Sequence, residues 1–403
     1  MIRAASLLLI SLGCAAGACA QSPSTSTADP EVAVAELSDS GVVVGAAVVA
    51  KRTIAIAVLS NEKVTLRLLH LDEQGVRQTS IVEGLPRFLT TMLGTASGLV
   101  IGAARDEQAS TGRDVVLVAK GSAPWTQSEQ VVNAGFAQYW ELKGKNLTLA
   151  QTLRSPNAFA WDEFGSSLMF VDGMLFVGAP SGAQSGSVYR YRFLSQRWQF
   201  VGSATADQQG FGGSLAANPL MLAVGASRRG DSAVRVYHRG RTALNLAQTI
   251  GVTHPSTKSL PIIATNGAYL FALGPTLVVA SEGPSQGDGG PSLPGAIDTF
   301  VLKRDRFEHQ SGIVGVTDVP RLALTSTKHQ QLIYSTEGRL TCRGPLPEVL
   351  ALVPCAEPWV RKITGSVVWL GKAGGKVLVV TRSVDEASVA KLRVWWIDHA
   401  AED

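Results

Sequence analysis

Two stretches of the chain repeat the same pattern at a fixed distance, and this repeat constrains the fold more than any other feature. The segment 164–168 (FGSSL) returns as 211–215 (FGGSL), and the segment 175–180 (LFVGAP) returns as 222–227 (LAVGAS). The offset is 47 residues in both cases. A fixed period of about 20 to 50 residues is typical of proteins built from repeated supersecondary units. The sequence therefore predicts a repeat architecture.

One repeat unit is predicted to contain four short strands. The first strand begins at the Phe-Gly segment, 164–168, and the second is the apolar run 174–177. The third is the alternating segment 187–193, and the fourth is the short strand 198–201. Asp172-Gly173 predicts a tight type I′ hairpin between the first two strands, and Gly178 is expected to end the second strand. A fourth-strand motif at 147–153 (LTLAQTL) returns 97 residues later at 244–250 (LNLAQTI), which is about two periods.

Weaker copies of the strand pattern extend the repeat in both directions. They lie at 53–59 and 64–71, 99–104 and 136–142, 277–280 and 295–302, 331–335 and 340–342, and 376–381 and 391–397. About 360 residues divided by this period give between seven and eight units. We therefore predict an all-β fold, a β-propeller of seven blades with four antiparallel strands each, with six or eight blades as alternatives. An open β-solenoid and a pair of sandwiches are the competing architectures.

The composition agrees with many short buried strands. The chain of 403 residues is 45% hydrophobic, has 41 Gly and only 17% charged residues, and its apolar runs are short. The formal net charge of +4 is small for this length, and the Lys and Arg residues are scattered. The sequence therefore gives no support to nucleic-acid binding.

Residues 1–20 have the features of an export signal. A positive residue, Arg3, precedes the apolar run 7–12 and a series of small residues. The segment 16–19 (AGAC) resembles a lipobox, with Ala16 in place of the usual Leu, and would make Cys19 the lipidated first residue of the mature protein. The alternative is cleavage before Gln21 and soluble export to the periplasm or medium. Residues 21–40 are predicted to be a flexible tether to a cell-envelope membrane, in particular the outer membrane, and 41–400 a single propeller.

Two cysteines remain in the predicted mature chain. Cys342 and Cys355 are 13 residues apart in a Pro-rich stretch, and they are predicted to form a disulfide in an oxidising compartment. A redox pair and a metal site are the alternatives, and neither C-x-x-C spacing nor nearby histidines support them.

No catalytic motif stands out. The six histidines form no H-E-x-x-H pattern, and the chain has no G-x-S-x-G nucleophile motif. Asp162-Glu163 resembles an acid/base pair, but neighbours on an extended strand would face opposite ways. Ser214 is interpreted as a strand residue, and Tyr189 and its counterparts Tyr191, Trp198 and Tyr237 as core residues between blades. We therefore predict no catalytic, cofactor-binding or metal residue.

The repeated Phe-Gly and Val-Gly-Ala-Pro segments resemble FG-GAP repeats, which build the propeller of integrin α-subunits and of many bacterial exported proteins. The resemblance is clearest over residues 136–250. Many repeats of that family carry an Asp-x-Asp-x-Asp-Gly calcium loop, but the corresponding connections here offer one carboxylate, Asp172, or none. This departure argues against a calcium cofactor.

The resemblance implies a binding function rather than catalysis. We expect a non-enzymatic exported lipoprotein whose propeller is a scaffold for a protein partner or a surface glycan, with a lectin-like propeller and an enzyme as alternatives. The Gly- and Pro-rich loop 282–294 is a candidate binding segment. For ring closure we expect a segment before Lys51, with 41–49 as the candidate, to pair with the C-terminal strand 391–397.

Overall fold

The computed structural model contains only strands and connections among the residues it describes. These are residues 32–398 except 39–40, 51, 73–74, 106–133, 157–160, 182–184, 208–209, 227–232, 241–242, 252–267, 274, 282–294, 317–321, 327–330, 337–338, 344–362, 364–365, 374–375 and 385–389. The described strands form seven antiparallel sheets, six of four strands and one of three. We number the sheets 1 to 7 in chain order.

Sheets 1 to 3 come first in the chain. Sheet 1 consists of β2 (Val42–Val49), β3 (Thr53–Ser60), β4 (Lys63–Asp72) and β5 (Gly75–Val82). Sheet 2 consists of β6 (Thr91–Gly94), β7 (Gly98–Ala103), β8 (Phe136–Lys143) and β9 (Asn146–Leu153). Sheet 3 consists of β10 (Ser167–Val171), β11 (Met174–Ala179), β12 (Ser187–Leu194) and β13 (Arg197–Thr205).

Sheets 4 to 7 complete the set. Sheet 4 has β14 (Phe211–Ala217), β15 (Met221–Ala226), β16 (Ala233–Arg239) and β17 (Leu244–Gly251), and sheet 5 has β18 (Ala268–Leu273), β19 (Thr276–Ser281), β20 (Gly295–Lys303) and β21 (Arg306–Val316). The three-stranded sheet 6 has β22 (Leu322–Ser326), β23 (Gln331–Thr336) and β24 (Arg339–Arg343). Sheet 7 has β25 (Ser366–Ala373), β26 (Lys376–Val384), β27 (Ala390–Asp398) and β1 (Val32–Ser38).

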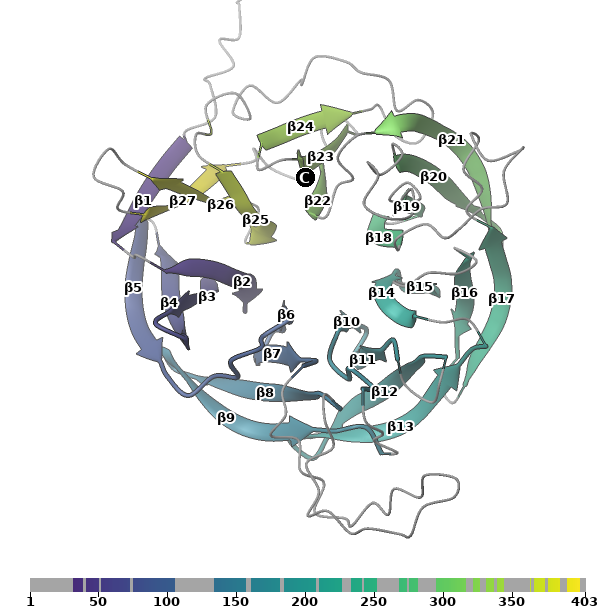
Figure 1. The fold of residues 1–403 in the computed structure, drawn as a ribbon, viewed down its shortest axis with the longest axis horizontal. Helices are drawn as coiled ribbons and strands as arrows, with labels where there is room; N and C mark the ends of the chain where they lie inside the picture. The colour runs from purple at the N-terminus through teal and green to yellow at the C-terminus, as the bar shows by residue number, and fades with distance from the viewer. Residues whose placement is uncertain are drawn as a thin grey trace, which may run out of the picture.

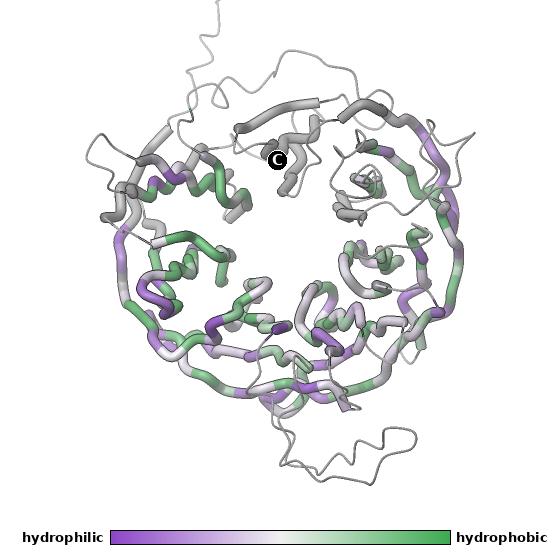
Figure 2. The backbone as a smooth tube through the Cα atoms, in the orientation of Figure 1, coloured by the Kyte–Doolittle hydropathy of each residue, from purple (hydrophilic) through white to green (hydrophobic). Residues whose placement is uncertain are grey.

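The sheets stand around a central channel like the blades of a propeller (Figure 1). The first strand of each sheet lines the channel, and each of these strands contacts the first strand of the next sheet around the whole ring. The core lies between the sheets, because the apolar side chains of the inner strands pack against the neighbouring sheet. Figure 2 shows the hydrophobic residues along inner strands such as β2. The prediction of an all-β propeller with antiparallel four-stranded units is confirmed.

The ring closes through β1, which pairs with β27 from Val32↔Ile397 to Ser38↔Lys391. A segment before Lys51 therefore does join the C-terminal strand, as expected. The choice of residues 41–49 was wrong, because they lie in β2, the channel-lining strand of sheet 1. Residues 32–38 belong to the ring rather than to a tether, since their backbone completes sheet 7.

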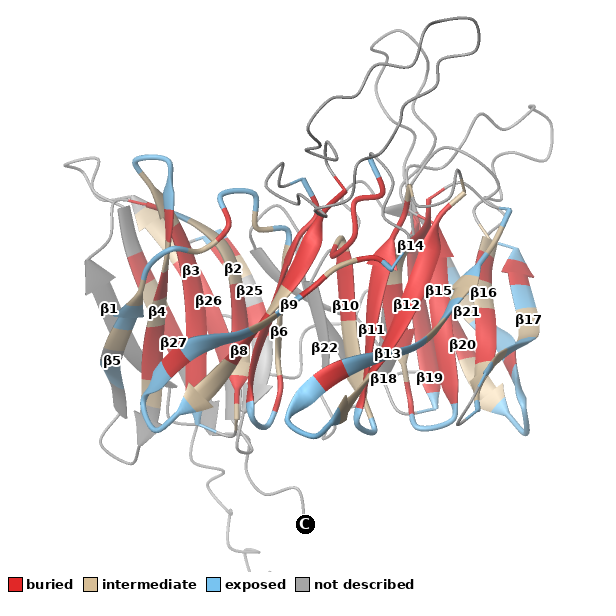
Figure 3. Ribbon diagram, turned by 90° about the horizontal axis from the view of Figure 1, so that it is seen from below, coloured by how far each residue is buried: buried red, intermediate tan, exposed pale blue. Residues whose placement is uncertain are grey.

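The two ends of the ring differ in their connections. The connections from first to second strand and from third to fourth strand lie at one end, which we call the turn face; Asp172-Gly173 and Ser195-Gln196 are two-residue examples. Both Asp172 and Gly173 have positive φ, at 48° and 73°, as predicted for that hairpin. Each second strand ends, and each channel-lining strand begins, at the opposite end, the loop face, which is uppermost in Figure 3.

The repeated glycines have a common structural role at the seams, by which we mean the packed surfaces between neighbouring sheets. A methyl group on Gly178 would lie 1.9 Å from the carbonyl oxygen of Gly212 in the next sheet, and one on Gly102 would lie 2.0 Å from that of Gly165. Gly165 and Gly212 themselves have φ of 95° and 94°, a region that only glycine adopts readily. The Phe-Gly and Val-Gly-Ala segments are therefore two halves of one backbone contact between sheets.

A β-bulge marks the same place in five sheets. The register between the third and fourth strands shifts after one residue of the third strand, which we call the bulge residue; these are Leu68, Tyr139, Arg190, Val236 and Thr299. All five bulge residues are buried. Their partners in the fourth strand are Ser80, Gln151, Gly202, Gln248 and Ser311. The bulge therefore gives a structural alignment of the sheets that does not depend on sequence similarity.

Candidate binding site

A pocket of about 460 Å³ opens on the loop face at the seam between sheets 2 and 3. The connection before β6 contributes Phe88, Leu89 and Thr90, the end of β7 contributes Ala104 and Arg105, and the ends of sheet 3 contribute Glu163, Ser166 and Pro180. The pocket therefore lies where the chain leaves one sheet and enters the next. The mouths of such closed β architectures are common places for ligands to bind.

The wall formed by residues 161–166 has an unusual backbone. Trp161, Glu163 and Gly165 have positive φ of 69°, 54° and 95°. Hydrogen bonds hold this conformation: the amide of Phe164 donates to the carbonyl of Ala134 at 2.9 Å, and the amide of Gly165 donates to the carbonyl of Gly178 at 2.9 Å. The interpretation of Asp162-Glu163 as neighbours on a strand was wrong, because β10 begins only at Ser167.

The repeat itself identifies Glu163 as an exception. The residue 47 positions later is Gly210, which also has positive φ, at 79°. Sheet 4 thus uses glycine where the backbone requires the left-handed region, whereas sheet 3 holds a glutamate there at a cost of roughly 1 kcal/mol or more. Backbone strain of this kind is concentrated at functional sites, so Glu163 points to a function of this rim.

The Glu163 carboxylate lies in a polar setting. Its side chain is 12% exposed, and its Oε1 lies 3.9 Å from Nε of Arg105. The hydroxyl of Ser181 donates to Oε2 at 3.3 Å. Two nearby hydroxyls donate to backbone carbonyls. Ser166 Oγ donates to the carbonyl of Glu163 at 2.8 Å, and Thr90 Oγ1 donates to the carbonyl of Gly165 at 3.1 Å. This arrangement offers one buried acceptor and one exposed cation, which suits recognition of a polar group.

Two exposed aromatic side chains belong to the segments that form the pocket: Phe88 lines it, and Trp161 lies two residues before Glu163 in the chain. Phe88 is 45% exposed and Trp161 is 58% exposed, and each lies on the connection that leads into a channel-lining strand. The guanidinium of Arg87 lies over the Phe88 ring, 5.4 Å from its centroid. Aromatic and arginine side chains are the residue types that contribute most to binding at protein interfaces. We refer to Phe88, Arg105, Trp161 and Glu163 as the rim site.

The residues predicted from sequence are not among the four residues of the rim site. Cys19 and Cys355 are outside the described residues, whereas Cys342 lies in β24. The loop 282–294 is also outside the described part of the chain. The four aromatic residues assigned to the core are buried at the seams as predicted, namely Tyr189, Tyr191, Trp198 and Tyr237. Sequence reasoning missed Phe88, Arg105 and Trp161, and the contrast of Glu163 with Gly210 was the signal that could have led to them.

The part of the chain that the structure describes has no group of three or more His, Cys, Asp or Glu residues placed to share a metal ion. In the same residues no helix of membrane-spanning length and apolarity occurs.

Comparison with known proteins supports the fold. A protein from Lactobacillus plantarum is similar with a TM-score of 0.53 and 13% identity, over 79% of this chain and 86% of that one. The periplasmic gluconolactonase of Pseudomonas aeruginosa gives 0.52 and 14%, over 76% and 83%. A chain of the mitotic checkpoint complex gives 0.54 and 11%, over 97% and 98%. No protein family and no curated protein matches the sequence. The fold defines the class, a β-propeller protein, and such propellers have diverse functions.

Proposed function

We propose that this protein is an exported, lipid-anchored propeller of seven blades that binds a protein partner through the rim site. The observation that carries the proposal is the rim site itself, which combines two exposed aromatic side chains with a glutamate held in a strained backbone conformation. A surface glycan with a polar group for Glu163 is the alternative ligand. The scaffold would contribute affinity by holding these side chains in place, because rigid loops lose little entropy on binding.

The direction of β1 determines at which face of the ring a tether from Cys19 would be attached. Val32 pairs with Ile397, and Ile397 pairs with Val377 beside the connection from β25 to β26. The chain therefore enters the ring at the turn face. If Cys19 carries the lipid, the tether leaves from the turn face and the rim site faces away from the membrane. This arrangement supports a partner in the surrounding compartment rather than in the bilayer.

The repeated glycine contact supports the proposed relation to FG-GAP propellers. The Phe-Gly half of each clear unit meets a second-strand glycine of the preceding sheet across a seam, Gly165 with Gly102 and Gly212 with Gly178. A repeat motif with such a backbone role is a property of the fold. It therefore supports a common architecture and leaves the partner to be decided by the rim.

A photo-crosslinking experiment tests the binding proposal. We expect p-benzoylphenylalanine at Phe88 or Trp161 to form a discrete adduct with one partner in the native envelope, identified by mass spectrometry. The matched controls are Leu194 and Leu220, which are 42% and 62% exposed at the turn face and should give no such adduct. Adducts of equal yield from both faces, or none from the rim positions, would overturn the proposal.

A hydrolase is the second candidate, because a gluconolactonase has a similar fold and Glu163 offers a buried carboxylate in a pocket. Purified protein should show no turnover of gluconolactone above the uncatalysed rate. Turnover that falls at least 100-fold in Glu163→Gln would replace the scaffold proposal with the enzyme.

Cell fractionation tests the anchor. We expect Cys19→Ser to move the protein from the membrane fraction to the soluble fraction, whereas Cys14→Ser should leave it in the membrane fraction. Equal partition of wild type and Cys19→Ser into detergent would contradict lipidation at Cys19.

A further inference from the structure

The outermost strands of neighbouring sheets are fastened by a glutamine at two seams. The side-chain amide of Gln151 donates to the carbonyl of Trp198 at 2.9 Å and accepts from its backbone amide at 2.8 Å. Gln248 makes the same pair of bonds with Phe307, both at 2.8 Å. These two glutamines belong to the repeated LxLAQT motif, so the motif joins sheet 2 to sheet 3 and sheet 4 to sheet 5.

The seam between sheets 3 and 4 lacks this clamp. The bulge alignment places Gly202 where sheets 2 and 4 have Gln151 and Gln248, whereas sheets 1 and 5 have Ser80 and Ser311. The position of Trp198 and Phe307, near the start of the fourth strand, is occupied in sheet 4 by Leu244. Leu244 has a smaller side chain than Trp198 or Phe307. It lines a pocket of about 310 Å³, which opens on the turn face.

An arginine replaces the usual bulge residue at this seam. Arg190 is only 3% exposed, and among the five bulge residues described it alone carries a charge. Its guanidinium lies against Gly202, where a methyl group would come within 2.7 Å of Nη2. Burial and the neighbouring Arg192 charge lower the pKa of Arg190. The cation is therefore held in a place where its charge is poorly solvated.

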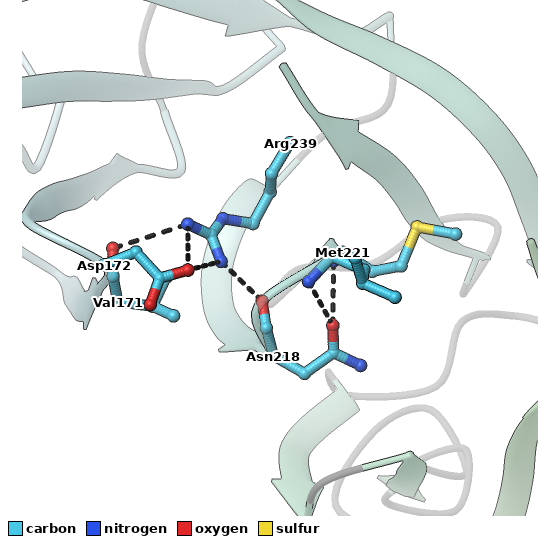
Figure 4. A network of polar contacts seen from close by, with 6 residues as sticks. Val171, Asp172, Asn218, Met221 and Arg239 are labelled. Carbon is cyan, nitrogen blue, oxygen red and sulfur yellow. Dashed lines mark hydrogen bonds and ion pairs between the residues drawn. The ribbon is translucent and has the colours of Figure 1, made fainter. Parts of the chain in front are cut away.

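The charges that line the pocket do not balance. Arg190, Arg192 and Arg239 contribute three positive charges and Asp172 one negative charge, a net charge of +2. Arg239 is engaged in a local network, because its guanidinium donates to Asp172 Oδ2 at 3.1 and 3.2 Å and to the carbonyl of Asn218 at 2.6 Å (Figure 4). Arg190 and Arg192 line the same pocket, together with the apolar side chains of Phe176 and Leu244.

We propose that this pocket binds a phosphate group carried on a small organic molecule. Guanidinium groups match the oxygens of phosphate with paired hydrogen bonds, and a phosphate monoester carries close to two negative charges at neutral pH. The apolar walls suit the organic part of the ligand. The phosphate can come from a soluble ester or from a lipid headgroup, since the pocket opens on the face where the chain enters the ring at Val32.

Titration calorimetry with inorganic phosphate at constant ionic strength tests the pocket. We expect saturable binding by the wild-type chain and at least 10-fold weaker binding by Arg190→Val, because a charged hydrogen-bond donor is lost. Valine is chosen because Val236 occupies this position in sheet 4, so the variant should fold. The control is Arg197→Ala, an exposed arginine on the same face outside the pocket, which should keep the affinity within 2-fold.

A second variant closes the pocket without changing its charge. Leu244→Trp introduces the side chain that the equivalent position of sheet 3 carries, and we expect it to abolish phosphate binding while the melting temperature stays equal or rises. Undiminished binding by both Arg190→Val and Leu244→Trp, or absence of saturable binding by wild type, would overturn the proposal. Tighter binding of succinate than of phosphate would overturn the assignment to phosphate.

Vesicle sedimentation identifies the source of the phosphate group. The non-acylated Cys19→Ser chain is mixed with vesicles of phosphatidylcholine alone or with added phosphatidylglycerol. Sedimentation with the anionic vesicles that is lost in Arg190→Val identifies a lipid headgroup, and calorimetric binding without sedimentation identifies a soluble ester; both results uphold the pocket. Equal sedimentation of Arg190→Val and its parent would assign vesicle binding to general surface charge and contradict a headgroup in the pocket.

Discussion

The seam between sheets 2 and 3 and the seam between sheets 3 and 4 share one backbone contact and differ in their side chains. In both, a glycine of the second strand meets the carbonyl of a Phe-Gly glycine in the next sheet. The first seam is then filled by aromatic rings, with Trp198 packed edge-on against Tyr139 and Phe193, and fastened by Gln151. The second seam has Gly202, Leu244 and Arg190 instead.

The difference teaches which part of a repeat is fixed. The glycine contact places neighbouring sheets at the right distance, so it recurs wherever the Phe-Gly segment recurs. The side chains of the third and fourth strands can then differ from seam to seam, and they either fill the space between the sheets or leave a pocket there. The two pockets follow from this freedom: one lies at the loop face of the first seam and the other at the turn face of the second.

The largest effect is expected for the shared contact. Gly178→Ala and Gly102→Ala should each destabilise the protein by about 3 kcal/mol, because the added methyl group meets a backbone oxygen that cannot move alone. Urea unfolding measures the loss. The control is Ala280→Gly, the equivalent position of sheet 5, for which about 1 kcal/mol is expected. A large loss at one glycine and none at the other would show that the two seams do not share this contact.

The next effect separates the seams. Gln151→Ala should lower the free energy of unfolding by about 2 kcal/mol, since the amide and carbonyl of Trp198 both lose their partner. Gln199→Ala, at an exposed position beside Trp198, should change stability by less than about 0.5 kcal/mol. Equal urea midpoints for the two variants would show that the Gln151 side chain does not stabilise the seam between sheets 2 and 3.

A smaller effect concerns pH. Burial, and to a lesser extent Tyr189, raises the pKa of Tyr191, whose hydroxyl donates to the carbonyl of Arg154 at 2.9 Å. The pKa of Tyr191 in the folded state exceeds the value of about 10 in the unfolded state. The contribution of Tyr191 to the free energy of unfolding is therefore complete below pH 10 and is lost as the pH rises further, by up to about 1.4 kcal/mol per pH unit. Tyr191→Phe should weaken this loss in urea unfolding at alkaline pH.

The equivalent tyrosine of sheet 4 sharpens that test. Burial raises the pKa of Tyr237 as well, but Arg235 acts in the opposite direction through its charge and a hydrogen bond. Tyrosinate absorbance should therefore show Tyr237 ionising before Tyr191 when Phe variants of each are compared. The reverse order would contradict the electrostatic difference between the two seams.

The smallest effect is expected at the rim. Glu163→Gly copies sheet 4 and should raise stability by about 0.5 kcal/mol, because relief of the left-handed backbone outweighs a weak ion pair with exposed Arg105. Thermal unfolding measures the change, and Gly210→Glu should have the opposite sign. A loss as large as that of Gln151→Ala would make Glu163 a structural residue rather than part of a binding site.

The strands were predictable from the sequence because local patterns determine them. The alternation of 187–193, the apolar run 174–177 and the Asp172-Gly173 turn are all visible within a few residues, and β10 to β13 lie where these patterns are. The closing strand was missed because 32–38 follows directly after a stretch rich in Ser, Thr and Pro. Its role depends on β27, at the other end of the chain.

The candidate sites could not be predicted from the period alone. Val177 pairs with Tyr189 and Val224 with Arg235, so the third strands are offset by 46 residues rather than 47. Aligning the two repeats with an offset of 47 residues therefore places Arg190 opposite Tyr237. That alignment hides the fact that Arg190 and Val236 occupy the same buried position. Gly202 and Leu244 acquire meaning only when the bulge register is known. The contrast of Glu163 with Gly210 is visible in the sequence, but its meaning depends on the positive φ of both residues, which only the structure gives.

The pairing of β1 with β27 also sets the order of events in folding. Val32 meets Ile397, which is 365 residues further along the chain, and closing a loop of that length costs about 5 kcal/mol of chain entropy. Contacts of such high sequence separation form late and slowly. During synthesis, sheets 1 to 5 can be assembled from strands that are neighbours in the chain. Sheet 7 keeps an open edge at β27 until both ends of the polypeptide are free to meet.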